Sequence, residues 1–393
     1  MKVAFLTHEY PPYIFGGIGS FAKNLADSLS KLGVEVTIIS GIPAYNLRKA
    51  TTRKVEGDIT VLRFPYPNIP PRHTFFQIAN MKSLCKAIRS EHPDVVHGQS
   101  WSSYPTLLNL KQDIPSIVTF HASPKMEKVT SIRSILRGGS LTDIFTYVLG
   151  YYPMSFLSNH ELKLSNLSVA VSKTLRSELI NEFGQKYSGK IKTIYNGVNL
   201  EKFDAEYELA GNGAEESENT IFFAGRLFWR KGALNLIRMA YLLQKQNSTF
   251  KIIVHGIGPL FHKLQSEISF LGLRNIELKG FTTRQQLMEN MHKSKFIVVP
   301  SMYEACPMSL LEGMCSGKIP IMLKKPFSNE LSENGAYGVL EDNMDSLTNK
   351  LLEFRDTEDL QSFGNRIRTF AREKYDSKKV AREYLQVYKK ICS

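Results

Sequence analysis

Two basic residues follow an apolar run in the middle of the chain. The run Ile221–Ala224 is typical of a strand, and Arg226 and Lys231 lie in the segment directly after it, Gly-Arg-Leu-Phe-Trp-Arg-Lys-Gly. An arginine fork binds two oxygens at once, and a lysine supplies a compact positive charge, so the pair suits a diphosphate. Taken alone, the segment fits a pair of solvated surface cations equally well.

A second segment predicts a helix whose first turn could bind an anion. The strand Phe296–Val299 is expected to end before Pro300, and Pro307 fits the first position of the helix that follows. The backbone N–H groups of Met308 and Ser309 would then be free to meet a phosphate, helped by the helix dipole.

Two glutamates flank this helix start. Glu304 lies in the loop before the helix, and Glu312 lies on its second turn with a side chain that leans back toward the N-terminus. Both carboxylates could therefore face the same ligand. In the structural alternative, Glu304 is an acid at a helix start and Glu312 is a surface residue. The apolar residues around Glu312 favour the functional interpretation.

A glycine-rich loop near the N-terminus is a weaker signal. Gly16 and Gly17 precede a helix expected from about Ser20 to Leu32, and the motif G-x-G-x-x-A begins at Gly17. The dinucleotide-binding fingerprint places its first glycine directly after the first strand, whereas Gly17 lies ten residues beyond Thr7. The loop could still present N–H groups to an anion, or it could be a helix entry without a ligand.

The elements that must position these residues alternate along the chain. Apolar runs and helix-period stretches follow one another, which is typical of βαβ units and parallel sheets. The expected strands are Val3–Thr7, Val34–Ser40, Val95–His97, Ile117–His121, Leu167–Val171 and Ile191–Tyr195, then Ile221–Ala224, Lys251–His255, Ile276–Lys279, Phe296–Val299 and Ile319–Leu323.

The length of 393 residues suits two domains. Residues 204–219 (DAEYELAGNGAEESEN) are acidic and poor in apolar side chains, a composition that indicates a linker. We therefore predict an α/β fold with a Rossmann-like domain at 1–203 and another at 220–370. A helix within 371–393 is expected to pack back toward the first domain. Open α/β sheets bind ligands at the carboxyl ends of their strands, which predicts a cleft between the domains.

Composition limits the partners. The formal charge of +13 favours anionic partners, but no zinc-finger spacing or RNP-like strand appears, so nucleic acid is not expected. Four cysteines without CxxC pairing indicate free thiols in a reducing compartment. No apolar run reaches the roughly 18–20 residues of a membrane span, and the first residues do not resemble a signal peptide. We expect a cytoplasmic protein.

One apolar segment allows two interpretations. Phe145–Leu157 is rich in aromatic residues and too short to span a bilayer. Such a segment suits the membrane interface, and the nearby Arg133 and Arg137 would be drawn to anionic lipid. It suits a core helix about equally well. A peripheral position on the cytoplasmic membrane face is therefore an expectation for this chain.

Together these motifs resemble the large family of retaining glycosyltransferases that includes sucrose synthase, glycogen-synthase-like enzymes and phosphatidylinositol mannosyltransferases, which share the GT-B fold. The resemblance spans nearly the whole chain. It rests on Gly16-Gly17, Asp94-Val-Val-His97, Thr119-Phe-His121, Val171-Ser-Lys173 and Asn196-Gly197-Val198, then on Arg226 through Lys231, Gly256-Ile-Gly258-Pro259 and Glu304 through Glu312. The R-x4-K and E-x7-E elements together are the strongest part of this signal.

The resemblance implies roles in the second half of the chain. Arg226 and Lys231 would neutralise the leaving diphosphate, where charge grows in the transition state. Glu312 would bind ribose hydroxyls, and Glu304 would touch the donor sugar. The chain contains no D-x-D, so the two cations would replace a metal. The nucleotide diphosphate sugar is a substrate, and no cofactor is expected.

In the first half, the resemblance implies that His121 hydrogen-bonds the sugar beside the reacting carbon. His97 would lie on the acceptor side, and Gly16 and Gly17 would help to bind the donor. When the family resemblance is set aside, a histidine at a strand end, such as His121, more often has a structural role.

The chain also departs from the family pattern. Gln99 stands where a second histidine is common, Ala122 where aspartate is frequent, Ala305 where glycine is usual, and Pro326-Phe327 where a glycine pair often occurs. These departures leave the residues of the phosphate site intact. They affect the assignment of the donor sugar and of the acceptor.

The resulting expectation is a retaining, metal-independent hexosyltransferase that uses a nucleotide diphosphate sugar and a saccharide or lipid-linked acceptor. A non-catalytic nucleotide-sugar-binding protein remains an alternative, because Ala122 and Ala305 could reflect lost activity. A nucleotide-sugar epimerase of related fold is a further alternative, although nothing supports its second nucleotide pocket. A phosphorylase would need a pyridoxal lysine and a longer chain, and the misplaced glycines disfavour an NAD-dependent oxidoreductase.

Overall fold

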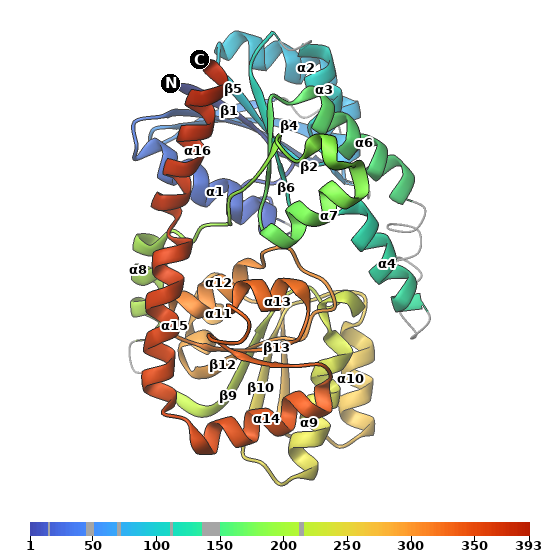
Figure 1. Ribbon diagram of the computed structural model, residues 1–393, viewed down its shortest axis with the longest axis vertical. Helices are drawn as coiled ribbons and strands as arrows, with labels where there is room; N and C mark the ends of the chain where they lie inside the picture. Colours follow the sequence, from blue (N-terminus) through green and yellow to red (C-terminus); the bar gives the residue numbers. More distant parts are fainter. Residues whose placement is uncertain (15, 45–50, 69–71, 111–112, 136–149, 212–215) are drawn as a thin grey trace. The chain divides into compact units, whose positions relative to one another are not determined.

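A computed structural model describes residues 1–14, 16–44, 51–68, 72–110, 113–135, 150–211 and 216–393 (Figure 1). The chain divides into two compact units. Unit 1 comprises the described residues of Met1–Lys128, Phe145–Gly197 and Ser377–Ser393. Unit 2 is formed chiefly by Val198–Asp376.

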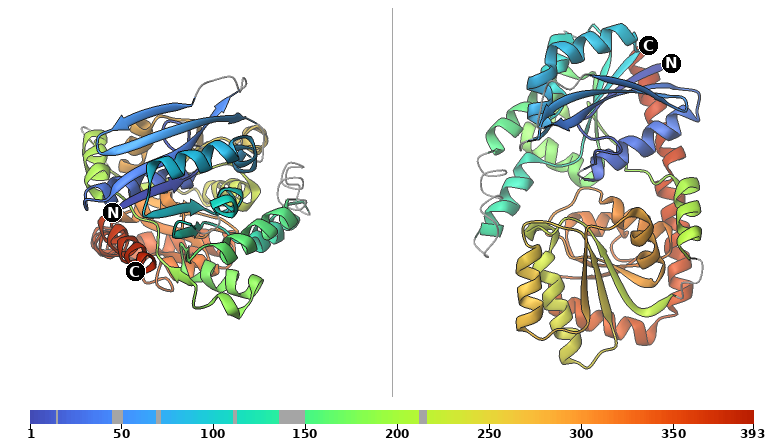
Figure 2. Two further views of the ribbon diagram at one scale, coloured as in Figure 1. Left: turned by 90° about the horizontal axis from the view of Figure 1, so that it is seen from above. Right: turned by 180° about the vertical axis from the view of Figure 1, so that it is seen from behind.

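Unit 1 contains an eight-stranded sheet with the order β3-β4-β2-β1-β5-β6-β7-β8. Its strands are β1 (Lys2–Leu6), β2 (Glu35–Ala44), β3 (Thr52–Glu56), β4 (Ile59–Pro67), β5 (Val95–Gln99), β6 (Ser116–Phe120), β7 (Leu167–Ala170) and β8 (Ile191–Thr193). Its helices are α1 (Gly17–Ser30), α2 (Arg72–Glu91), α3 (Tyr104–Leu110), α6 (Tyr151–Leu164), α7 (Lys173–Phe183), the short η2 (Gln185–Tyr187) and α16 (Ser377–Cys392), and α4 (Pro124–Ile135) begins in this unit. Neighbouring strands are parallel except for β3 and β4, and helices lie on both faces of the sheet (Figure 2).

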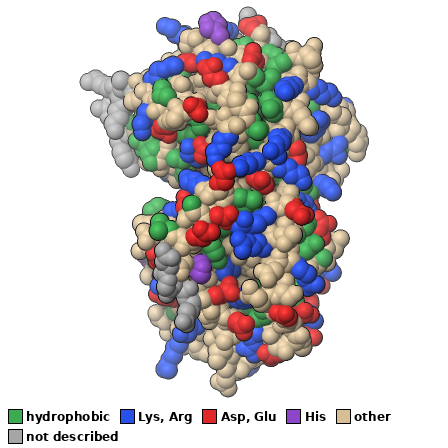
Figure 3. All heavy atoms as spheres, turned by 90° about the vertical axis from the view of Figure 1, so that its left-hand side faces the viewer, with side chains coloured by type: hydrophobic (Ala, Val, Ile, Leu, Met, Phe, Trp, Pro, Cys, Tyr) green, Lys and Arg blue, Asp and Glu red, His purple; other side chains and the backbone are tan. Residues whose placement is uncertain are grey.

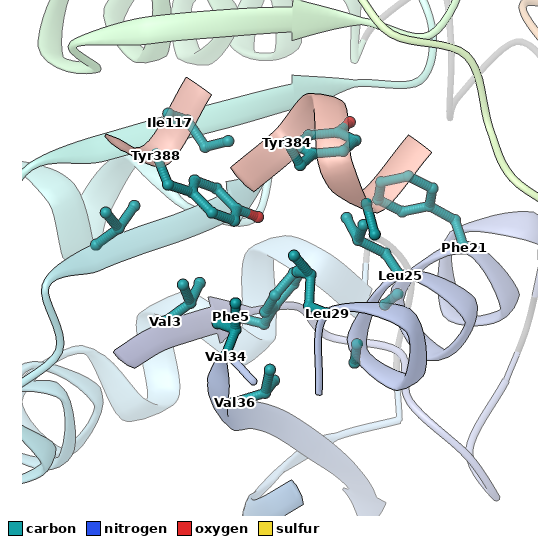
Figure 4. Packing of buried hydrophobic residues seen from close by; sticks show 14 of the residues in the cluster. Val3, Phe5, Phe21, Leu25, Leu29, Val34, Val36, Ile117, Tyr384 and Tyr388 are labelled. Carbon is teal, nitrogen blue, oxygen red and sulfur yellow. The ribbon is translucent and has the colours of Figure 1, made fainter. Parts of the chain in front are cut away.

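The core of unit 1 joins the first and last helices of the chain. Alternate residues of β1, among them Phe5, point toward the side chains of α1 and α16 (Figure 4). On α16, Tyr384 and Tyr388 are fully buried with Val380 and Val387, which recur at helical spacing and form one apolar stripe. Each such side chain contributes about 1.5–3 kcal/mol by its burial. The C-terminal helix is therefore an integral part of unit 1.

Unit 2 contains a six-stranded parallel sheet with the order β11-β10-β9-β12-β13-β14. Its strands are β9 (Ser217–Ala224), β10 (Lys251–His255), β11 (Ile276–Gly280), β12 (Ser294–Val299), β13 (Ile319–Leu323) and β14 (Val339–Glu341). Its helices are α8 (Leu200–Gly211), η3 (Trp229–Lys231), α9 (Ala233–Lys245), α10 (Phe261–Phe270), α11 (Arg284–His292), α12 (Met308–Cys315), α13 (Pro326–Leu331), α14 (Met344–Thr357) and α15 (Leu360–Tyr375).

The segment expected to be a linker is mostly regular structure. Residues 204–211 belong to α8, β9 begins at Ser217, and residues 212–215 lie outside the described part of the chain. Its acidic side chains are not simply solvated, because Asp204 pairs with Arg372 of α15 and Glu206 pairs with Arg284 of α11. Composition alone could not reveal these distant partners, so the segment is more regular than its composition indicated.

The compact units also differ from the predicted domain limits. Residues 198–203 group with unit 2, and so does all of α15, whereas only Ser377–Ser393 at the C-terminus groups with unit 1. The predicted boundary at 370 therefore falls inside α15, which runs from Leu360 to Tyr375.

The expected peripheral position on a membrane depends on the apolar segment at 145–157 and on the distribution of surface charge. Residues 145–149 lie outside the described part of the chain, and the rest of the segment includes the first two turns of α6. Among the helices described, none combines the length and the apolar character needed to cross a bilayer. On the face shown in Figure 3, Lys and Arg side chains lie among Asp and Glu side chains. The net charge is therefore not gathered into a single basic patch on this face.

Candidate active site

Glycines bring three loops of unit 2 into contact at the carboxyl ends of β9, β10 and β12. Gly256 has a φ of 134°, and a Cβ there would lie 1.9 Å from the carbonyl oxygen of Gly225. Gly232 has a φ of 74°, and a Cβ there would lie 2.0 Å from the carbonyl oxygen of Pro300. Only glycine fits both requirements, a positive φ and no side chain. The glycines thus fix the loop that carries the two predicted cations.

The structure brings Lys231 and Glu304 together. The Lys231 Nζ lies 2.5 and 2.6 Å from the two carboxylate oxygens of Glu304. The Ser301 hydroxyl also donates to Glu304, at 3.0 Å. The Glu304 side chain is only 9% exposed. A half-buried lysine therefore holds its charge beside a nearly buried carboxylate, and a phosphate that approached Lys231 would compete with Glu304 for it.

Arg226 and the start of α12 occupy the same two loops. Arg226 is exposed, and its guanidinium carbon lies 4.4 Å from the centre of the Phe228 ring, a cation–π contact that restricts its position. Pro307 is the residue before α12, one position earlier than predicted, and makes no capping hydrogen bond through its side chain. The first N–H groups of a helix have no intrahelical partner, so those of Met308 and Ser309 could meet an anion.

Glu312 forms an ion pair that the sequence did not reveal. Nη1 and Nη2 of Arg284 donate to the two oxygens of Glu312 at 2.9 and 3.0 Å, and Nε donates to Glu206 at 2.9 Å. Burial alone would lower the pKa of the Arg284 guanidinium, but the two carboxylates more than offset it and raise that pKa. Glu312 is thus a fixed carboxylate that is 13% exposed, rather than a mobile surface residue.

In unit 1, His121 follows β6 and is held by two neighbours. Its Nε2 lies 2.7 Å from the side-chain oxygen of Gln99, the last residue of β5. The Phe21 ring of α1 meets the imidazole edge-on, with 4.9 Å between the centroids. Burial lowers the pKa of His121 to about 4, so the ring is neutral near pH 7. With the Gln99 carbonyl as acceptor, the proton lies on Nε2 and Nδ1 offers a lone pair.

The glycine loop of unit 1 already contacts an anion from the chain itself. The N–H of Gly16 donates to the carboxylate of Glu9 at 2.9 Å, and Glu9 is 6% exposed. α1 then begins at Gly17. The predicted contribution of Gly16 to donor binding therefore cannot rest on its own N–H in this conformation, because a buried carboxylate occupies that position.

Two family models together match nearly all of residues 15–373. One, described as Glycosyltransferase Family 4, matches residues 15–202, and the other, described as Glycosyl transferases group 1, matches residues 204–373. The chain belongs to the group 1 glycosyltransferases.

Relatives of this glycosyltransferase agree with that assignment. An uncharacterized glycosyltransferase of Methanocaldococcus jannaschii is 29% identical over 81% of the chain and 79% of the relative. Sucrose-phosphate synthase from Thermosynechococcus elongatus has a similar structure, with a TM-score of 0.77, 17% identity and coverage of 99% and 98% of the two chains. Anabaena HepE in complex with UDP-glucose has a TM-score of 0.69, 17% identity and coverage of 99% and 100%. At these identities the structures show the fold, and the predicted GT-B fold of two Rossmann-like domains is confirmed.

The structure places His97 of this glycosyltransferase in the core. Its ring is fully buried, with Nδ1 2.8 Å from the Tyr388 hydroxyl and Nε2 2.7 Å from the Thr119 hydroxyl. Burial holds the pKa of His97 well below its usual value, so the ring is neutral. A side chain with no exposed surface cannot contact an acceptor in this conformation. The acceptor-side role predicted for His97 is therefore not supported, and its hydrogen bonds instead connect β5, β6 and α16.

The charge state of His121 is directly testable. Because burial lowers the pKa of His121 to about 4, we expect its imidazole to stay neutral from pH 8 down to about pH 5. NMR of protein labelled with ¹⁵N-histidine, assigned with His121→Asn, should show one Nε2–H tautomer over this range. A His121 signal that titrates within this range would contradict the prediction.

Proposed function

We propose that this glycosyltransferase moves a hexosyl unit from a nucleotide diphosphate sugar to a saccharide or lipid-linked acceptor. The observation that carries the proposal is the Lys231–Glu304 pair, which lies at the carboxyl ends of β9 and β12 with Arg226 and the start of α12 in the same two loops. Cations and helix N–H groups suit a diphosphate, and a carboxylate suits sugar hydroxyls. The UDP-glucose complex of HepE, a protein with the same fold, supports this class of donor.

The proposed chemistry follows from these contacts. As the bond between the sugar and the diphosphate breaks, Arg226 and Lys231 would neutralise the negative charge on the departing phosphates. Phosphate binding to Lys231 would free Glu304 to accept a hydrogen bond from a sugar hydroxyl. In unit 1, Nδ1 of His121 could accept a hydrogen bond from a hydroxyl group. We propose that the acceptor oxygen bonds to the anomeric carbon on the face from which the diphosphate leaves, and that the departing phosphate takes the proton of the acceptor. No carboxylate then acts as nucleophile, and the sugar keeps its configuration.

Donor class can be tested by thermal shift. Ligands that bind only the folded state raise the melting temperature. UDP, GDP and ADP and their hexose conjugates should therefore include at least one that stabilises the protein. No shift with any of them would contradict the proposed donor, whereas binding without turnover would favour a non-catalytic nucleotide-sugar-binding protein.

Metal independence and stereochemistry form a second test. Because the chain has no D-x-D and two cations would hold the diphosphate, we expect full activity in excess EDTA. The new linkage should keep the anomeric configuration of the donor, which NMR of the product would show. An inverted product would contradict the retaining mechanism, and loss of activity in EDTA that Mg²⁺ restores would contradict the metal-independent one.

A lipid-linked acceptor is favoured by one surface of unit 1. On α6, Tyr152 is 71% exposed and Phe156 is 53% exposed. The Lys128 Nζ lies 5.0 Å from the centre of the Tyr152 ring. Exposed aromatic rings beside a cation suit the interface of an anionic membrane. We therefore propose that this surface rests on the membrane that holds the acceptor.

Flotation on anionic vesicles tests this membrane proposal. The protein should float with phosphatidylserine-containing liposomes at low salt, and less so at high salt because salt screens the attraction. Changing Tyr152 and Phe156 together to Ser should reduce the floated fraction severalfold. Phe270→Ser, which alters an 86% exposed ring of unit 2, is the control and should float normally. Equal flotation of the Tyr152 and Phe156 variant would contradict a membrane role for α6.

A further inference from the structure

Arg284 uses its whole guanidinium fork on two carboxylates of unit 2. It is the first residue of α11, and Thr283 before it forms a capping box with Gln286, so the helix start is fixed. Nη1 and Nη2 bind Glu312 of α12 at 2.9 and 3.0 Å, and Nε binds Glu206 of α8 at 2.9 Å. Two parallel hydrogen bonds fix both the position and the plane of the Glu312 carboxylate.

This pairing leaves the carboxylate able to bind a ligand. An ionised carboxylate has about four lone-pair directions, two on each oxygen. Arg284 occupies one direction on each oxygen of Glu312, so one direction on each oxygen remains. Two acceptors in a fixed plane match two neighbouring hydroxyl groups, the arrangement that the 2′- and 3′-hydroxyls of a ribose present.

We infer that Arg284 is a positioning residue that holds Glu312 for the ribose of the donor nucleotide. This inference rests on the proposed function, and specifically on a nucleotide that binds beside α12. Without Arg284, the Glu312 side chain would be free to rotate. Nucleotide binding would then have to order this side chain, and the entropy lost would lower the affinity. A lysine would keep the positive charge but lose the planar fork, so it would not fix the plane of the carboxylate.

The test compares two nucleotides that differ only in the ribose hydroxyls. Calorimetry on the full-length protein would first identify which of UDP, GDP and ADP binds most tightly, and would then use that nucleotide and its 2′,3′-dideoxy counterpart. We expect Arg284→Gln and Arg284→Lys to lower the affinity for the ribonucleotide by about tenfold, the scale of one charged hydrogen bond. Affinity for the dideoxy nucleotide should change by less than about twofold, because that ligand cannot use Glu312.

Arg238→Gln is the matched control. It also breaks an arginine–carboxylate pair in unit 2, with Asp345 at 2.9 Å, and should leave both affinities unchanged. Arg284→Lys keeps the charge and carries the test if Arg284→Gln does not fold. Equal losses for the two nucleotides, or full ribonucleotide affinity in Arg284→Lys, would overturn the inference. A wild-type protein that binds none of the three nucleotides would instead overturn the proposed function, and this inference with it.

Discussion

Replacing Lys231 by alanine is expected to lower the turnover number by about 10²-fold or more, the effect of losing one electrostatic stabiliser of the transition state. Lys231 lies within 2.6 Å of both oxygens of Glu304, so the change also leaves a carboxylate that is 9% exposed without its cation. Arg226→Ala should lower turnover on the same scale, because the proposed diphosphate would lose its bidentate partner. The measurement is kcat at saturating nucleotide sugar.

Two further variants make this result specific. Lys245→Ala removes an exposed cation at the end of α9 and should leave kcat unchanged. Because Lys231 and Glu304 are in direct contact, Lys231→Ala combined with Glu304→Gln should lose less activity than the sum of the single effects. Near-normal rates for both Lys231→Ala and Arg226→Ala would refute the phosphate assignment. Strictly additive losses in the double variant would show that the contact between Lys231 and Glu304 does not contribute to activity.

Periodicity predicted the central strands because they are buried on both faces. Strands such as β1, β6 and β12 are buried and contain apolar runs such as Phe296–Val299, which the sequence shows directly. It did not show β3, β4 or the short β14. Four of the five β3 residues are exposed, and β4 contains Pro65 and Pro67, residues that normally argue against a strand. β3 is the edge strand of the sheet, where the requirements of the interior are relaxed, and β4 lies next to it between β3 and β2.

The structure differs from the predicted linker and from the predicted surroundings of His97 for a related reason. The acidic stretch that follows Phe203 belongs to α8, because Asp204 and Glu206 have arginine partners far along the chain. His97 is placed by Tyr388, which lies 291 positions later and fills the core beside it. Composition and local spacing carry no information about partners at such distances, so these contacts required the structure.

The candidate site was predictable where motifs are local. Arg226, Lys231, Glu304 and the start of α12 follow directly from loops at strand ends, and the structure pairs Lys231 with Glu304. Arg284 was not predicted, because it belongs to another helix and no spacing connects it to Glu312. The single-residue departure at position 99 was visible in the sequence, yet its meaning, a hydrogen bond to His121, came only from the structure.

Gly232→Ala is expected to destabilise unit 2 and to abolish most of the activity, although it adds only one methyl group. The residue has a φ of 74°, which costs an alanine about 1–2 kcal/mol. The new Cβ would also lie 2.0 Å from the carbonyl oxygen and 2.5 Å from the carbonyl carbon of Pro300, and backbone atoms cannot turn aside as a side chain can. The loop ending in Lys231 must then move away from the loop that leads to Glu304. We expect a loss of about 3–5 kcal/mol in the free energy of unfolding, measured by urea denaturation.

Gly272→Ala separates backbone strain from the clash. Gly272 also has a positive φ, 59°, but nothing lies within 4 Å of the position that an added Cβ would take. This variant should therefore lose only about 1–2 kcal/mol and keep normal nucleotide affinity. Gly232→Ala should in addition lose nucleotide affinity under conditions where it is still folded, because the displaced loop carries the cation proposed to bind the diphosphate. If the two variants lost equal stability and both kept their affinity for nucleotide, the close packing of Gly232 on Pro300 would not be what positions Lys231.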